Sequence, residues 1–71
     1  MFTIYSKHQC SQCDQAKMLL DLKGIEYKTL TLGDDFTREE LIEKVPTARS
    51  FPVVFKGEDL IGGLLELKKA I

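Results

Sequence analysis

The sequence predicts an α/β fold whose elements follow the order β-α-β-α-β-β-α. Strand, helix and strand patterns succeed one another in the first half of the chain, which indicates a parallel pair joined by a right-handed crossover. Two short apolar segments in the second half lie so close together that they indicate an antiparallel hairpin. With 71 residues, the chain is expected to form one domain, residues 1–71, around one core.

A strand and a helix open the chain. Residues 2–6 mix β-branched and aromatic side chains, which is typical of a strand, and we expect this strand to be central. The helix is expected to begin near Cys10 or Ser11, because Ser11 followed by Asp14 resembles a capping box. It should end just before Gly24, which stands where the residue after a helix C-cap is expected.

The middle of the chain predicts a second strand over residues 25–32 and then a second helix. Thr37 and Glu40 have the spacing of a capping box at the start of this helix. Pro46 is expected to end it at about Lys44, because a proline disfavours helical backbone in the residue before it.

The last third of the chain predicts two more strands and a third helix. Residues 51–55 form the third predicted strand and residues 60–61 the fourth. Gly62 and Gly63 then interrupt the chain before a helix over residues 64–70.

Cys10 and Cys13 are the only cysteines, and they lie where the first strand passes into the first helix. Cys13 shares one helix face with Ala16 and Leu20, so we expect it to point towards the core while Cys10 stays open to solvent. A bridge between residues this close in sequence stabilises a fold by only about 2 kcal/mol, so chemistry explains the pair better than stability does. In a βαβ unit such a pair indicates the thioredoxin fold, here in a short form with a four-stranded mixed sheet flanked by three helices.

Charge and composition exclude several classes of function. The net charge is −1 and the lysines are scattered, so the chain has no basic stripe for binding nucleic acid. Met1 is followed at once by a strand pattern and no apolar run reaches membrane length, so we expect neither a signal peptide nor a membrane span. The expected location is therefore the reducing cytoplasm, where a cysteine pair is catalytic or metal-binding more often than structural.

Metal binding is the main structural alternative for the cysteine pair. Zinc normally takes four ligands, and His8 is the only histidine, so even with both cysteines and His8 a carboxylate would have to complete such a site. We therefore expect no metal site. His8 is expected to be an exposed loop residue that at most modulates Cys10.

Three segments, in this order and spacing, resemble the glutaredoxin family over essentially the whole chain. The family's active-site segment is matched by Tyr5-Ser6-Lys7 leading to Cys10-Ser11-Gln12-Cys13. Its Thr-Val-Pro element, in which the proline is cis, is matched by Ala48-Arg49-Ser50-Phe51-Pro52. Its Gly-Gly turn is similar to Ile61-Gly62-Gly63.

This resemblance implies a thiol–disulfide oxidoreductase with Cys10 and Cys13 as its catalytic residues. It also implies a monomer with glutathione as co-substrate, no tightly bound cofactor, and disulfide-containing proteins such as ribonucleotide reductase as electron acceptors. A cis Pro52 would let the backbone of Phe51 receive an extended, sulfur-bearing ligand. The residues expected to contact substrate or glutathione are Lys7, Gln12, Arg49, Ser50, Phe51, Pro52, Gly62 and Gly63.

Two departures from the family pattern leave the electron donor open. Glutaredoxins usually carry Pro-Tyr where Ser11 and Gln12 stand, and a glutamine there resembles the redoxins that thioredoxin reductase reduces and that serve ribonucleotide reductase. Members that use glutathione usually have an Asp after the Gly-Gly turn, whereas Leu64 and Leu65 stand here. The expected donor is therefore either glutathione or thioredoxin reductase.

A function of another class is also compatible with the resemblance, namely a metal or iron–sulfur cluster held through Cys10 and glutathione. Family members that bridge clusters usually carry a single active-site cysteine, so the second cysteine here favours disulfide exchange. For exchange, the helix N-terminus is expected to lower the pKa of the Cys10 thiol from about 8.5, with Lys7 adding to the effect. Cys10 would attack a substrate disulfide, and Cys13 would then resolve the mixed disulfide.

Lys7 and Arg49 each have a second interpretation. Lys7 is equally compatible with an ordinary exposed lysine. Arg49 is expected either to bind a carboxylate of glutathione or of a partner, or to brace its own loop.

Overall fold

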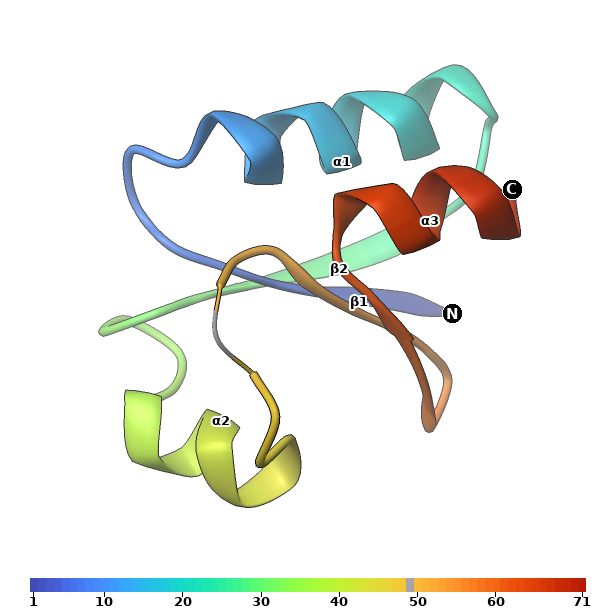
Figure 1. The fold of residues 1–71 in the computed structure, drawn as a ribbon. Helices are drawn as coiled ribbons and strands as arrows, with labels where there is room; N and C mark the ends of the chain where they lie inside the picture. The colour runs from blue at the N-terminus through green and yellow to red at the C-terminus, as the bar shows by residue number, and fades with distance from the viewer. Residues whose placement is uncertain (49) are drawn as a thin grey trace.

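A computed structural model describes residues 1–48 and 50–71, and its strands form one mixed sheet in the order β2-β1-β3-β4 (Figure 1). Its strands are β1 (Phe2–Ser6), β2 (Tyr27–Thr31), β3 (Val53–Lys56) and β4 (Asp59–Gly62). β1 pairs with β2 in parallel and with β3 in antiparallel orientation, and β3 and β4 form an antiparallel hairpin. The predicted central strand, parallel pair and hairpin are therefore confirmed.

Helices cover both faces of this sheet. The helices α1 (Ser11–Leu22) and α3 (Leu64–Ala70) lie on one face, and α2 (Arg38–Lys44) lies on the other (Figure 1). The predicted element order, with a four-stranded mixed sheet between three helices, is confirmed for the described residues. None of these helices is long and apolar enough to cross a membrane.

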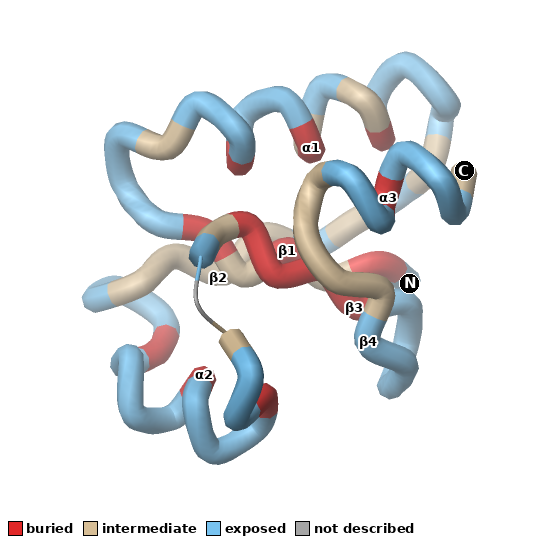
Figure 2. The backbone as a smooth tube through the Cα atoms, viewed as in Figure 1, coloured by how far each residue is buried: buried red, intermediate tan, exposed pale blue. Residues whose placement is uncertain are grey.

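The alternation of side chains along the strands divides the core into two clusters. Ile4 is fully buried against α1 and α3, whereas its neighbour Tyr5 packs on the opposite face among Phe36 and Phe55. Burial is accordingly concentrated in β1 and β3, the strands covered from both sides (Figure 2). The buried members of the first cluster are Phe2, Ile4, Ala16, Leu20, Val54 and Leu67. Those of the second are Phe36, Leu41, Val45, Val53 and Phe55.

The first helix begins as predicted but is capped by a different residue. Cys10 is the N-cap, with extended backbone angles, and its sulfur accepts a hydrogen bond from the Cys13 N–H. The capping box expected from Ser11 and Asp14 is therefore wrong, because Ser11 is already the first helical residue. At the other end, Gly24 has a φ of +68°, as expected for the residue that follows the C-cap.

The second helix has the predicted capping box at its start and ends where Pro46 predicted. Thr37 Oγ1 accepts the Glu40 N–H at 3.2 Å, and Glu40 Oε1 accepts the Thr37 N–H at 2.9 Å, which completes the capping box. The helix ends at Lys44, with Val45 as C-cap immediately before Pro46.

Strand boundaries differ from the predictions by one or two residues. β2 begins at Tyr27 because the N–H of Ile25 bonds the carbonyl of Leu20, which ties this residue to the end of α1. β3 begins at Val53 because Pro52 has no N–H to contribute to a ladder. β4 is longer than predicted by one residue at each end.

Two leucines of α1 test how much of the stability depends on the cluster between the sheet and α1. Leu20 is fully buried, so Leu20→Ala is expected to lower the free energy of unfolding by about 2–5 kcal/mol. Urea unfolding of the oxidised protein measures this loss. The matched control is Leu22→Ala on the same helix, where the side chain is 80% exposed and the change should stay within about 0.5 kcal/mol. Equal losses for the two variants would contradict the assignment of the core.

Candidate active site

The end of β1 and the start of α1 position the two cysteines. Cys10 and Cys13 are joined by a disulfide, with their Cα atoms 5.2 Å apart. Cys13 lies on the buried face of α1 and is 1% exposed, while Cys10 is partly exposed at the N-cap. Both expected orientations are confirmed, so reagents in solution reach only the Cys10 sulfur.

The backbone at the start of α1 favours negative charge on the Cys10 sulfur. Its Sγ accepts the Cys13 N–H at 3.2 Å, and the same helix end carries further N–H groups without partners inside the helix. A hydrogen bond to a charged group is stronger than one to a neutral group, so it stabilises a thiolate more than a thiol. When the disulfide is reduced, this geometry therefore supports a nucleophilic thiolate at Cys10.

The second wall of the site is the segment that leads into β3. The Phe51–Pro52 peptide bond is cis, as predicted, and Pro52 is buried. The Lys7 ammonium lies 5.9 Å from the centre of the Phe51 ring, within the range of a cation–π contact. This contact brings the loop after β1 and the segment before β3 together.

A groove of about 420 Å³ runs between these two segments past Cys10. The residues that line it are Lys7, Gln9, Cys10, Ser11, Gln12, Arg38, Ser50 and Phe51. Of the described residues that line it, Lys7 and Arg38 carry positive charges and none carries a negative one. This end of the groove is therefore suited to a ligand that carries a carboxylate.

A second hollow of about 270 Å³ continues the groove towards α3. It shares Gln12, Ser50 and Phe51 with the first hollow. The other residues around it are Pro52, Gly63, Leu64, Leu65, Glu66 and Lys68. Phe51 therefore borders both hollows.

The groove brings together most of the residues that the sequence suggested for binding. Lys7, Gln12, Ser50 and Phe51 line the part next to Cys10, and Pro52 and Gly63 line its continuation. Gly62 lines neither of these two hollows. It borders a third, of about 220 Å³, which shares Ser50, Pro52, Gly63 and Glu66 with the continuation of the groove. Arg49 lies outside the described residues.

The glycine pair before α3 shapes the backbone. Gly62 has a φ of +126°, and a Cβ atom there would lie 2.7 Å from Glu66 Cγ. The Gly63 N–H donates to Glu66 Oε1 at 2.7 Å, which satisfies the N–H of the N-cap residue of α3. The pair thus permits the sharp entry into α3 that places Gly63 beside Pro52.

Arg38 was not singled out from the sequence, although it lines the groove. It directly follows the Thr37 cap of α2, where an exposed basic residue is unremarkable. Its place opposite Cys10 depends on the packing of α2 under the sheet, and no local pattern encodes that packing.

His8 faces solvent, as expected. Its Nε2 pairs with Asp34 Oδ2 at 3.0 Å, and the two side chains are 72% and 64% exposed. Within residues 1–48 and 50–71, no three side chains among histidine, cysteine, aspartate and glutamate gather closely enough to hold a metal ion.

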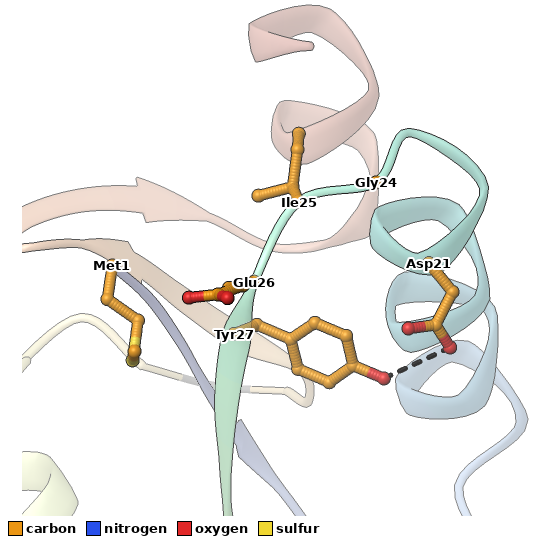
Figure 3. A pocket seen from close by; sticks show the side chains of 6 residues that line it. All are labelled: Met1, Asp21, Gly24, Ile25, Glu26 and Tyr27. Atoms are coloured by element: carbon orange, nitrogen blue, oxygen red, sulfur yellow. Dashed lines mark hydrogen bonds between the residues drawn. The ribbon is translucent and has the colours of Figure 1, made fainter.

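A larger hollow of about 610 Å³ lies at the opposite end of α1 and contains neither cysteine (Figure 3). There the Tyr27 hydroxyl donates to Asp21 Oδ2 at 3.2 Å. Desolvation and, to a lesser degree, the neighbouring Asp21 carboxylate raise the pKa of Tyr27 above its ordinary value. This hollow contains no thiol, whereas Cys10 lines the groove at the other end of the helix.

Comparison with known proteins agrees with this geometry. The sequence model of the glutaredoxin family, described simply as glutaredoxin, matches residues 2–61. The chain belongs to the glutaredoxin family. It is 35% identical over 65 residues to glutaredoxin 3 of Escherichia coli strain K12, an alignment that covers 90% of this chain and 77% of that glutaredoxin. It is also 36% identical over 67 residues to the hybrid peroxiredoxin hyPrx5 of Haemophilus influenzae, covering 94% of this chain and 27% of that protein.

Solved glutaredoxin structures share the fold. The crystal structure of a buckwheat glutaredoxin–glutathione complex matches with a TM-score of 0.83 and 28% identity, over 96% of this chain and 64% of the other. The solution structure of a Brucella melitensis glutaredoxin matches with a TM-score of 0.73 and 30% identity, over 96% and 74% of the two chains. The predicted thioredoxin fold is therefore confirmed, and family membership makes the chain a thiol–disulfide oxidoreductase.

The different exposure of the two cysteines predicts selective alkylation. When the reduced protein is treated with limiting iodoacetamide, Cys10 is expected to react first and Cys13 to stay protected, because Cys13 is 1% exposed. Cleavage after Lys7 and Lys17 yields one peptide with both cysteines, whose fragmentation locates the label. The alkylation rate of Cys10 should reach half its plateau below a pH of about 8.5. The reason is that the stabilised thiolate becomes the predominant form of Cys10 at a lower pH than in an ordinary thiol.

The Cys13→Ser variant is the control for this experiment, since it leaves a single reactive sulfur. Its alkylation rate should follow the same dependence on pH. Faster labelling of Cys13 than of Cys10 in the unmodified protein would contradict the assigned geometry.

Proposed function

We propose that this glutaredoxin reduces protein disulfides and glutathione mixed disulfides, with glutathione as the co-substrate that restores its dithiol. One observation carries the proposal. The partly exposed Cys10 sulfur opens onto a groove whose opposite wall is the cis Phe51–Pro52 segment, and Cys13 is bonded to it from the buried side.

The first step uses Cys10 alone. The Cys10 thiolate attacks one sulfur of the substrate disulfide, a bond forms between these two sulfurs, and the other substrate sulfur leaves as a thiolate that takes up a proton. The Cys13 N–H, which bonds Cys10 Sγ, holds the nucleophile in place and stabilises its charge before the attack.

The second step uses Cys13. Its thiolate attacks Cys10 Sγ, the 10–13 disulfide forms, and the remaining substrate sulfur leaves as a thiol after protonation. The position of Cys13 one helical turn after Cys10, with the Cα atoms 5.2 Å apart, permits this bond without a change of fold. Two electrons have then moved from the protein dithiol to the substrate disulfide.

The backbone of Phe51 provides a docking strand for the substrate. Among the described residues, no backbone group is hydrogen-bonded to the N–H or C=O of Phe51. An extended peptide beside Cys10 would pair with these groups as an added strand does. Lys7 and Arg38 would attract carboxylates of such a ligand, and Gln12 and Ser50 would offer polar side chains along the groove.

Glutathione meets these requirements, since it is a short peptide with a thiol and two carboxylates. The structural neighbour from buckwheat, in complex with glutathione, supports its use as co-substrate. Disulfide-containing enzymes such as ribonucleotide reductase are the proposed acceptors.

Thioredoxin reductase is the second candidate donor, and two observations favour it. Gln12 lines the groove beside Cys10, where the resemblance to reductase-fed redoxins was found. The wall near α3, where the usual Asp is absent, presents Leu64 and Leu65. Neither leucine offers an acceptor for the amino group of glutathione.

Reduction of the 10–13 disulfide by two donors in parallel distinguishes the candidates. One reaction contains glutathione, glutathione reductase and NADPH, and the other contains thioredoxin reductase and NADPH. Oxidation of NADPH in the glutathione reaction supports the first proposal, and oxidation only in the other supports the second. Failure of both donors to reduce the disulfide would reject both.

Substitution of each cysteine separates the two steps. Cys10→Ser is expected to lower turnover to the uncatalysed background, because the nucleophile is lost. Cys13→Ser is expected to accumulate a mixed disulfide with protein substrates, visible by mass spectrometry, while keeping reduction of glutathione mixed disulfides, which needs only one thiol. Full activity of Cys10→Ser would reject the assigned nucleophile.

A further inference from the structure

The groove has one wall that the proposed chemistry does not use. Leu64 and Leu65 are the first two residues of α3, and both line the continuation of the groove. Leu65 is 67% exposed, although exposing an aliphatic side chain costs free energy. An exposed leucine is common on protein surfaces, but this one borders the same hollow as Gln12 and Phe51.

Leu64 and Leu65 lie on the same continuous surface as the reacting Cys10 sulfur. Gln12 and Phe51 line both parts of the groove, so the surface runs without interruption from Cys10 to the start of α3. A peptide bound along Phe51 with its cysteine at Cys10 therefore has a neighbouring side chain within reach of Leu65.

The charged side chains beside the two leucines have opposite signs, so the aliphatic surface is what sets this wall apart. Glu66 and Lys68 both border this part of the groove and carry opposite charges. Glu66 also directs Oε1 back to the Gly63 N–H at 2.7 Å, which holds its carboxylate against the backbone. The wall thus presents two leucines and no net charge. It is therefore not expected to favour a charged group of the ligand.

We propose that Leu65, supported by Leu64, selects protein disulfides whose cysteine is flanked by an aliphatic or aromatic side chain. This inference rests on the proposed function, because it assigns the substrate preference of the same groove. An apolar side chain that covers Leu65 removes apolar surface of both partners from water. A lysine or glutamate at that place would lose part of its hydration, and the opposite charges of Glu66 and Lys68 would largely offset each other for either sign.

Short peptide disulfides test the preference directly. Each peptide is blocked at both ends and carries one cysteine bonded to thionitrobenzoate, with Leu, Lys or Glu either before or after the cysteine. Cys10 of the pre-reduced protein attacks the peptide sulfur, a Cys10–peptide disulfide forms, and the coloured thionitrobenzoate anion leaves. The second-order rate constant of this single turnover requires no electron donor, so it is independent of the open question about the donor.

The unmodified protein is expected to react with the best Leu peptide roughly three- to tenfold faster than with the corresponding Lys and Glu peptides, as partial burial of a leucine implies. Leu65→Asp should abolish this preference and favour the Lys peptide. An acidic residue in the first turn of a helix is well tolerated, so the variant is expected to fold. Any general effect of the new charge on Cys10 changes all peptides alike and cancels in the ratio of rate constants.

Leu22→Asp is the matched control, because Leu22 is 80% exposed on α1 and does not line the groove. It should keep the preference of the unmodified protein. Two results would overturn the inference while leaving the proposed function intact. One is equal rate constants for the Leu, Lys and Glu peptides, whether the varied residue stands before or after the cysteine. The other is an unchanged preference in Leu65→Asp. Absence of thionitrobenzoate release from every peptide would instead overturn the proposed function.

Discussion

The antiparallel pairing of β1 with β3 is the constraint on which the active site depends. Because the strands run in opposite directions, the end of β1 lies beside the beginning of β3, with Tyr5 opposite Val53. The loop that carries Cys10 therefore emerges next to the segment that carries Pro52, although some forty residues separate them in sequence. The pairing is held by burial on both faces, since Ile4 packs under α1 and α3 and Tyr5 packs over α2.

The first turn of α1 places the two cysteines in different environments. A helix leaves its first N–H groups unpaired, so the residue at the N-cap faces donors and solvent together. The residue three positions later has turned towards the sheet, where Ala16 and Leu20 continue the same buried face. Attack and resolution therefore require no separate structural elements, because one helical turn provides an accessible sulfur and a shielded one.

Local signals made most of the fold predictable, and long-range packing accounts for what they missed. The Thr37–Glu40 capping box and Gly24 marked helix ends correctly, because caps are encoded by residues adjacent in sequence. The Ser11–Asp14 box was wrong because the Cys10 sulfur accepts an equivalent hydrogen bond one residue earlier. Arg38 could not have been assigned to the groove, since only the packing of α2 against the sheet brings it there. The binding role that the family motif suggests for Gly62 stays a prediction, since Gly62 borders a hollow next to the groove.

The burial of Cys13 protects the active site of the protein from irreversible oxidation by peroxide. Peroxide reaches the partly exposed Cys10 sulfur and converts it to a sulfenic acid, whereas Cys13 is shielded and stays a thiol. The neighbouring thiol then condenses with the sulfenic acid, releases water and forms the 10–13 disulfide before further oxidation to the irreversible sulfinic acid. Chemical damage is thereby converted into the ordinary oxidised form of the catalytic cycle, from which the usual electron donor recovers the protein.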